Sequence, residues 1–332
     1  MSTVLGATRN LAARWSSPIV LYHSTYDVVP AELGAGVHNV DPDTLCRQLE
    51  WLSASFRFLS VDEWFAEGRP NGTACVTFDD GYRSVCESVL PRLVEMNIPA
   101  TMFLNGSSLC GEVFWRDKVL LLLNRGLVDS FVSTEIARDA GLDDLTADTF
   151  YRGTKHPSRN SKVVDLALDA YLEQHDLVDE LPRETVTSRD DLVHHPLITY
   201  GNHSHRHYIP RSLDEDGQRA EFIECERVLD DLALNRSNVL SIPFGGRVHV
   251  DETTEAIVSE MDFSAVVFSS NAVNFSRHRS PWAGLPAADR YMATESHDAF
   301  MRRHARLSYL RPDSPLRTVA RTARNRIRSV VR

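Results

Sequence analysis

The sequence predicts an α/β fold built on parallel strands, and two observations support this prediction. Short apolar stretches typical of buried strands alternate with segments of helical spacing, and the joints between them are short. The chain of 332 residues is also long enough to bury one large core, or a core with a smaller appendage. Its composition, with 42% hydrophobic and 25% charged residues, is that of an ordinary globular protein.

The expected strands are apolar or β-branched runs that end in loops, and the expected helices have leucines at helical spacing. In chain order these elements are a strand over 17–23, a helix over 43–56 with Asp41 or Asp43 as its N-cap, a strand in TACVTFDDGY, a helix over 83–96, a strand in PATMFLN, a strand in LITYGN, a helix over 221–232, and strands in NVLSIPFGG and FSAVVFSS.

Three segments fall outside this alternation. Residues 1–16 form an N-terminal extension before the main domain at 17–300, and residues 106–191 are expected to be a mainly helical insertion between two strands. Residues 301–332 form a basic tail whose single acidic residue is Asp313. Because its apolar residues share one helical face, the tail is interpreted either as an amphipathic helix on an anionic membrane surface, or as a solvated or docked tail.

Charge and cysteine content exclude several classes of protein. A formal net charge of -10 argues against nucleic-acid binding. The five cysteines are widely spaced and form no CxxC pair, which argues against a disulfide framework and a thiolate metal site.

The apolar run at Leu120–Leu123 is far shorter than the roughly 20 residues of a membrane span, and the N-terminus lacks the apolar core of a secretory signal. The expected location is therefore the cytoplasm.

Two short motifs carry the chemistry. TFDDGY places Asp79 and Asp80 at the end of a strand, where α/β folds gather ligands, although Asp-Gly is also a common turn signal. HSHRH places His203 and His207 four residues apart, a spacing that can turn both imidazoles toward one ion. One carboxylate and two imidazoles leave coordination positions for water, which is the layout of a hydrolytic metal site.

The motifs SPIVLYHS, VTFDDGY, IPATMFLNG, GNHSHRH and PFGG occur in the order expected of polysaccharide deacetylases, carbohydrate esterase family 4, which this chain resembles from about Ile19 to Arg290. The segment FWRDKVLLLL also resembles the insertion of members associated with surface-polysaccharide biosynthesis. The resemblance implies a distorted parallel (β/α) barrel, opened on one side, with the metal at the carboxyl ends of the strands.

The resemblance also implies a role for each motif residue. Asp79 matches the general base that acts on a metal-bound water, and Asp80, His203 and His207 match the metal ligands. Ser204 matches the residue that braces the histidine loop. His205 stands at a variable position of the family, so it is expected to be solvent-exposed, with a contact at the cleft rim as the alternative. His23 and Tyr82 are expected on the substrate side, with packing of His23 under the cleft as the alternative. The backbone N–H groups of Phe244 and Gly245 would stabilise an oxyanion, although IPFGG is also explained as a strand that ends in a glycine turn.

Two family features are not found where they usually occur. Ser241 and Ile242 stand where an arginine commonly precedes the motif proline, and Arg290 is the proposed substitute that orients the base. The leucine-x-histidine motif that supplies the general acid is not visible late in the chain, so His278 and His297 remain as candidates, each of which is also explained as an ordinary surface histidine.

The function that follows is a metal-dependent hydrolase that removes an N-acetyl group from a sugar or glycan precursor, nucleotide-linked or lipid-linked. Zn²⁺ is the expected ion, and Co²⁺, Ni²⁺ or Fe²⁺ would fit the same ligands. The alternatives are an O-deacetylase, a cyclic imide or ureide hydrolase, and a catalytically silent carbohydrate-binding domain. A binding domain has no need of Asp79 as a base, which argues against the last alternative.

Overall fold

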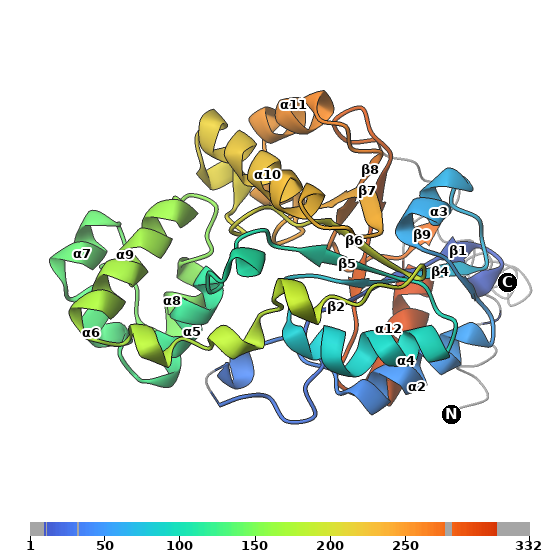
Figure 1. Ribbon diagram of the computed structural model, residues 1–332, viewed down its shortest axis with the longest axis horizontal. Helices are drawn as coiled ribbons and strands as arrows, with labels where there is room; N and C mark the ends of the chain where they lie inside the picture. The colour runs from blue at the N-terminus through green and yellow to red at the C-terminus, as the bar shows by residue number, and fades with distance from the viewer. Residues whose placement is uncertain (1–9, 11, 32, 276–280, 311–332) are drawn as a thin grey trace, which may run out of the picture.

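A computed structural model describes residues 10, 12–31, 33–275 and 281–310, with the side chains of 35, 309 and 310 left out. A barrel of parallel strands with helices around it forms the main body (Figure 1). Its strands are β2 (Ile19–Tyr22), β4 (Thr73–Phe78), β5 (Ala100–Leu104), β6 (Ile198–Asn202), β7 (Arg236–Ser241), β8 (Ala265–Phe268), β10 (Ala287–Asp289) and β11 (Tyr291–Met292). All neighbours along the order β10-β8-β7-β6-β5-β4-β2-β11 pair in parallel.

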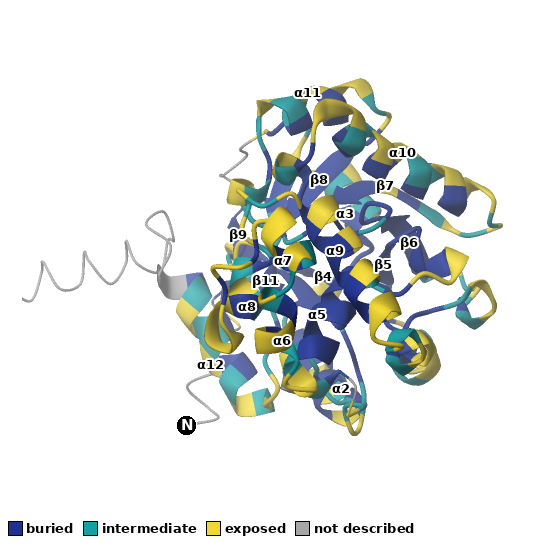
Figure 2. Cartoon of the chain, turned by 90° about the vertical axis from the view of Figure 1, so that its left-hand side faces the viewer, coloured by how far each residue is buried: buried dark blue, intermediate teal, exposed yellow. Residues whose placement is uncertain are grey.

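The barrel is nearly closed by one short segment. β10 pairs with β8 at one edge of the sheet, and β11 pairs with β2 at the other. Only Arg290 separates β10 from β11 along the chain, so both edges meet at this residue. The residues of the first six barrel strands are buried, whether their side chains point into the barrel or away from it, except at the start of β7. The outward side chains are buried because helices cover the outside of the barrel (Figure 2). The predicted distorted (β/α) barrel is confirmed, with a narrow opening.

Helices pack around the strands as the sequence predicts for parallel βα units. They are α2 (Pro42–Ser53), α3 (Val61–Ala66), the π-helical turn η2 (Val85–Val89) with α4 (Leu90–Glu95), α10 (Glu215–Asp230), α11 (Glu252–Glu260) and α12 (His297–Leu310). Asp41 caps α2, since its carboxylate accepts a hydrogen bond of 2.9 Å from the Thr44 N–H. α10 begins six residues before its expected start because Asp214 caps it.

Smaller elements connect these parts. They are β1 (Ser16–Ser17), which pairs antiparallel with β9 (Asn274–Phe275), β3 (Arg57–Phe58), which pairs with β4, and the 3-10 turns η1 (Gly34–Gly36), η7 (Pro210–Ser212) and η8 (Arg247–His249).

The segment between β5 and β6 forms a helical lobe beside the barrel (Figure 1), and Figure 2 shows this lobe in front of the barrel. Its elements are α5 (Trp115–Asn124), α6 (Val128–Val132), α7 (Glu135–Asp139), α8 (Ala147–Gly153), α9 (Ser161–Gln174) and the 3-10 turn η4 (Val178–Glu180). The 3-10 turns η3 (Ser108–Cys110), η5 (Arg183–Thr185) and η6 (Arg189–Asp191) lie on the segments that connect the lobe to the barrel. The lobe has a hydrophobic core of its own, in which Phe131, Phe150 and Tyr171 stack edge to face. A lobe with its own core can hold α5 rigidly against the mouth of the barrel.

The C-terminal end of the described chain packs on the body. α12 spans the expected boundary at residue 300 and packs against α2, with Phe300 and His304 fully buried. Residues 311–332, which carry most of the expected amphipathic tail, lie outside the described residues. None of the helices within the described ranges has the length and apolar character needed to cross a membrane.

Candidate active site

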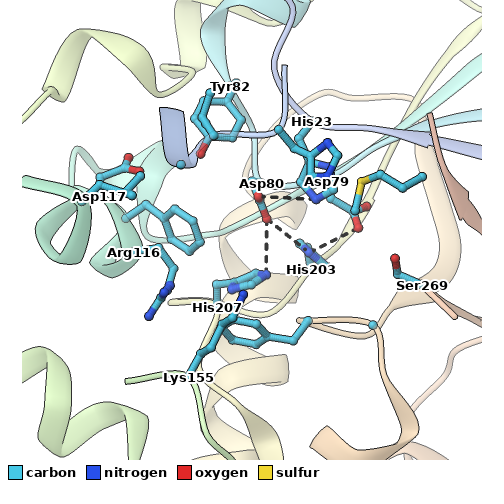
Figure 3. A pocket seen from close by; sticks show the side chains of 18 of the residues that line it. His23, Asp79, Asp80, Tyr82, Arg116, Asp117, Lys155, His203, His207 and Ser269 are labelled. Carbon is cyan, nitrogen blue, oxygen red and sulfur yellow. Dashed lines mark ion pairs between the residues drawn. The ribbon is translucent and has the colours of Figure 1, made fainter. Parts of the chain in front are cut away.

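The predicted site residues lie together in a cleft of about 200 Å³ at the carboxyl ends of the barrel strands (Figure 3). The barrel contributes Asp79 and Asp80 after β4, His203 and His207 after β6, and Phe244 after β7. Because parallel strands end at the same edge, loops far apart in sequence converge there. The opposite wall comes from α5 and the residue before it, and from the end of α8 and the segment that follows it.

Asp80, His203 and His207 form a group whose candidate ligand atoms all lie within 4.8 Å of one another. The Oδ1 atom of Asp80 is 3.5 Å from Nε2 of His203 and 3.3 Å from Nε2 of His207. Nδ1 of His203 is 2.9 Å from the carbonyl oxygen of Ser241, which fixes the ring and turns Nε2 toward the group. These three side chains match the predicted ligand set.

The buried atoms of this group fit a divalent cation. Asp80 Oδ1 is buried and accepts no hydrogen bond within the described residues, which is costly for a carboxylate oxygen unless a cation faces it. Burial, which outweighs the charge of Asp80, lowers the pKa of His207 to about 3 and keeps its imidazole neutral, as a metal ligand must be. Burial alone would raise the pKa of Asp80, but the neighbouring His207 and His23 hold it well below its usual range.

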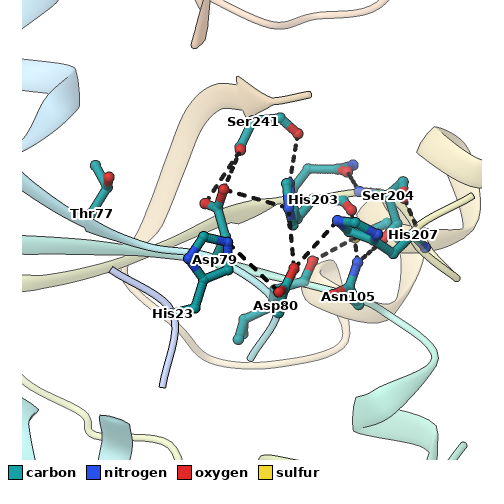
Figure 4. A network of polar contacts seen from close by, with 12 residues as sticks. His23, Thr77, Asp79, Asp80, Asn105, His203, Ser204, His207 and Ser241 are labelled. Atoms are coloured by element: carbon teal, nitrogen blue, oxygen red, sulfur yellow. Dashed lines mark hydrogen bonds and ion pairs between the residues drawn. The ribbon is translucent and has the colours of Figure 1, made fainter. Parts of the chain in front are cut away.

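Three loops of the site, after β4, β6 and β7, contain residues in an unusual backbone conformation. Left-handed φ angles occur at Asp80 (73°), Ser204 (64°), His207 (57°) and Phe244 (58°). The Ser204 hydroxyl accepts a hydrogen bond of 3.0 Å from the His207 N–H, so it braces the loop as the resemblance implies (Figure 4). Non-glycine residues in this region carry strain, which is typical of functional sites.

Asp79 is held by a buried arginine. The Arg290 guanidinium donates two parallel hydrogen bonds to the Asp79 carboxylate, at 2.7 and 2.6 Å, and both side chains are almost completely buried. Burial alone would raise the pKa of Asp79, but the charges of Arg290 and His203 lower it overall, so Asp79 is ionised. An ionised carboxylate 3.5 Å from His203 Nε2 is placed to accept a proton beside the candidate metal group.

Ser241 connects this arginine to the strand where the family arginine is missing. Nη2 of Arg290 donates a hydrogen bond of 2.7 Å to the Ser241 hydroxyl, which lies 3.3 Å from Oδ1 of Asp79 (Figure 4). The guanidinium therefore reaches, from the β10–β11 junction, the end of β7 that precedes the motif proline. This contact supports the predicted substitution of Arg290 for that arginine.

The two predicted oxyanion donors differ in availability. The Gly245 N–H already donates to the carbonyl oxygen of Ile242 at 3.0 Å, so it is not free. The Phe244 N–H makes no hydrogen bond to any described residue. Gly245 has a different role, because a Cβ atom there would lie 2.1 Å from Cβ of Ser269, and its φ of 62° favours glycine.

His23 lies at the end of β2, where sequence reasoning underestimated it. Its Nε2 atom is 3.8 Å from Oδ2 of Asp80, and it lines the cleft. Leu21-Tyr22-His23 has the leucine-x-histidine spacing that was sought only late in the chain. Because β2 pairs directly with β11, the last barrel strand, His23 occupies the strand end next to the expected position.

The two late histidines that were candidates for the general acid gain no support. His278 lies outside the described residues, and His297 begins α12 and does not line the cleft. The expectation that His205 is solvent-exposed was wrong. Its side chain is buried against Gly106, where an added Cβ would lie 2.6 Å from His205 Nδ1.

Sequence reasoning missed the residues that the helical lobe adds to the cleft. Phe114, Arg116, Asp117, Tyr151 and Lys155 line the wall opposite the strand ends, and Tyr82 lies on the same side of the cleft as Asp117 (Figure 3). The FWRDK segment was noted only as part of the family resemblance. Nothing in the alternation of charges within it shows which side chain faces the cleft.

Comparison with known proteins agrees with this fold. The fold is similar to those of the deacetylase PplD from Streptococcus pyogenes, solved in complex with acetate (TM-score 0.51, 16% identity, 86% of this chain and 97% of that chain), IcaB from Ammonifex degensii (0.50, 16%, 88% and 96%) and a de-N-acetylase from Aggregatibacter actinomycetemcomitans (0.50, 11%, 84% and 95%). At these identities the likeness shows a shared fold. No protein of curated function matches the chain.

A family model supplies the remaining comparison. Residues 66–127 match the model described as polysaccharide deacetylase, and this range includes β4, Asp79, Asp80 and β5. The resemblance to the polysaccharide deacetylase family, predicted from the order of five sequence motifs, is thereby confirmed.

Proposed function

We propose that this protein is a metal-dependent deacetylase that hydrolyses the N-acetyl group of a sugar. The observation that supports the proposal best is the pairing of a three-ligand group with a separate, ionised carboxylate. Asp80, His203 and His207 would hold the ion, and Asp79 stands beside them, oriented by Arg290. Zn²⁺ is the ion that a carboxylate and two imidazoles suit best.

The residues divide the reaction among them. An ion bound to this group would polarise the acetyl carbonyl and lower the pKa of water. Asp79 accepts the proton of the attacking water, and the Arg290 fork keeps its carboxylate aimed at that position. His23, on the other side of Asp80, is placed to protonate the departing amine nitrogen. The Phe244 N–H is the free backbone donor for the developing oxyanion.

The proposal is tested by metal content and acetate release. The untagged protein is analysed by mass spectrometry beside a His203→Ala/His207→Ala variant, and both are assayed on N-acetylated and O-acetylated sugars. We expect one transition-metal ion per wild-type chain, lost in the double variant together with acetate release from the amide. His205→Ala is the matched control, because His205 lies in the same loop outside the ligand group, and it should keep the ion. A wild-type chain that takes up no ion after incubation with Zn²⁺ would contradict the proposal.

We propose further that the sugar is a glycan precursor, carried in the cytoplasm on a nucleotide or a lipid. The five cysteines are free, which suits a reducing compartment, and the arginines of residues 301–332 suit an anionic membrane surface. Deletion of residues 311–332 is expected to reduce partition onto anionic lipid vesicles at low salt. Equal partition of the deleted and full-length chains would argue against the lipid carrier.

A further inference from the structure

Asp117 is a buried carboxyl group for which the proposed mechanism has no use. It lies in the first turn of α5, is 0% exposed, and lines the same cleft as Asp79 and Asp80. Neither of its oxygens makes a hydrogen bond to any described residue. Buried polar groups without partners are rare because each costs free energy, so such a group at a functional cleft indicates a missing partner.

A second carboxyl group in the lobe shows what a structural role looks like. Asp165 on α9 is also buried, but it accepts hydrogen bonds of 2.7 Å from Lys118 and 2.6 Å from Tyr208. Both basic neighbours of Asp117 in sequence are directed elsewhere, Lys118 to Asp165, and Arg116 to Thr154 and to the carbonyl oxygen of Tyr151 at 2.8 Å each. The fold therefore provides hydrogen-bond donors to Asp165, outside the cleft, and none from the described residues to Asp117, inside it.

The surroundings of Asp117 favour its neutral form. Burial first, and then the negative charge of Asp80, raise the pKa of Asp117 to about 8, and the opposing effect of Arg116 is smaller. A neutral carboxyl group both donates and accepts hydrogen bonds, which is what a sugar hydroxyl group requires. The titratable groups that interact electrostatically with Asp117 are Asp80, Arg116, Tyr82 and Tyr26. The others that line the same cleft are Asp79, Tyr151, Lys155, His23, His38, His203 and His207.

We propose that Asp117, as a neutral acid, binds a hydroxyl group of the sugar whose acetyl group is removed at the metal side of the cleft. The proposal rests on the proposed function for the identity of the substrate. It assigns the helical lobe a direct part in recognition, since α5 supplies the hydrogen-bonding group that faces the strand ends (Figure 3). Asp117 is thus a specificity-determining residue, and the reaction itself is carried by the barrel.

The test compares Asp117→Asn and Asp117→Leu with the wild type, using N-acetylglucosamine and its monodeoxy analogues as probes. The asparagine variant keeps a neutral donor and acceptor, so its KM should stay near the wild-type value. The leucine variant should raise KM about tenfold with little change in kcat, as expected for one lost hydrogen bond. One deoxy analogue should have a KM about tenfold higher than that of N-acetylglucosamine with the wild type. With Asp117→Leu, the KM of this analogue should equal that of N-acetylglucosamine, because the variant has already lost the contact.

Asp165→Asn is the control for damage to the lobe. It should lower the stability of the protein, while the increase in KM caused by each deoxy analogue stays the same as with the wild type. The inference is overturned if Asp117→Leu leaves KM unchanged, or if Asp117→Asn behaves like Asp117→Leu. It is also overturned if, for every analogue, the increase in KM caused by the missing hydroxyl group is as large in Asp117→Leu as in the wild type. Absence of acetate release by the wild type contradicts the proposed function instead. In that case the same series is read as binding of the sugars by saturation-transfer NMR, so the inference remains testable by itself.

Discussion

On the barrel side of the cleft, the carboxylates of Asp79 and Asp80 are surrounded by Arg290 and by histidines that favour their charged forms. On the lobe side, the carboxyl group of Asp117 has burial and the charge of Asp80 acting against ionisation. Three aspartates in one cleft therefore exist in two states. The difference shows that the protonation state of a carboxyl group here depends on the wall that carries it, with charged carboxylates on the barrel side and a neutral carboxyl group on the lobe side.

The largest effect on activity is expected from removing a charge on the barrel side of the cleft. Asp79→Asn should lower kcat/KM by about 10²–10⁴-fold, the usual contribution of a general base. The metal content should remain one ion per chain, because Asp79 lies outside the ligand group. Acetate-release kinetics and metal analysis on the same sample check this prediction. A variant that has lost both activity and the ion would place Asp79 among the ligands.

Arg290→Lys keeps the positive charge but loses the two-pronged contact with Asp79. We expect a decrease in kcat/KM of about 10–100-fold, the value of one charge-assisted hydrogen bond. Since Arg290 lowers the pKa of Asp79, the acidic limb of the pH–rate profile should shift to higher pH in the variant. A profile that keeps its acidic limb in place would show that Arg290 does not control the base.

The lobe side of the comparison is sharpened by stability measurements on Asp117→Asn. The folded-state pKa of Asp117 is raised from 3.8 to about 8, so its contribution to stability is fully present below about pH 4 and is lost as the pH rises toward 8. Asparagine does not titrate, so the stability of the variant does not decrease with pH for this reason. The free energy of unfolding of the variant minus that of the wild type should therefore increase by about 1–3 kcal/mol from acidic to mildly alkaline pH, which is the cost of a buried unpaired group.

Thermal unfolding of both proteins across that pH range measures this difference. The Tm of the variant should rise relative to that of the wild type as the pH increases. Parallel curves would mean that Asp117 has the same pKa in the folded and unfolded chains, and the contrast between the two walls would then disappear.

The smallest expected effect is that of Ser241→Ala. The change removes the hydroxyl group that accepts from Arg290 and contacts Asp79, while the direct contact between these two side chains remains. A decrease in kcat/KM of about fivefold corresponds to roughly 1 kcal/mol for such a bond. Steady-state kinetics check it, with Ser212→Ala, a serine away from the cleft, as the matched control. A loss as large as that of Arg290→Lys would mean that Ser241 is needed to position the arginine.

Much of the barrel side could be predicted from the sequence because strand ends are visible as motifs. β4 ends where TFDDGY indicated, and the spacing of HSHRH was sufficient to identify the pair that faces Asp80. Arg290 was predicted from its position after a Leu-Pro pair, although its contact with Ser241 depends on how the barrel closes. His23 was given a lesser role because adjacency of the second and last strands cannot be seen in the order of the chain.

The lobe side could be predicted only as a helical insertion. Within FWRDK, neighbouring charged residues point to different partners, with Lys118 paired to Asp165, Arg116 bonded to Thr154, and Asp117 facing the cleft. Helical periodicity gives the face of a residue, but which face meets the barrel depends on the packing of the whole lobe. The exposure expected for His205 was wrong for the same reason, since the neighbouring loop that covers it is remote in sequence.

Arg290 is the residue at which the two edges of the sheet meet, and it is also the residue that holds Asp79. A chain released from the ribosome before this point would keep every ligand of the TFDDGY and HSHRH motifs, yet it would lack the counter-ion of its base. Such a fragment could gather metal but would be a poor catalyst. The proposed hydrolysis would then depend on a contact that can form only after synthesis has passed the last strand.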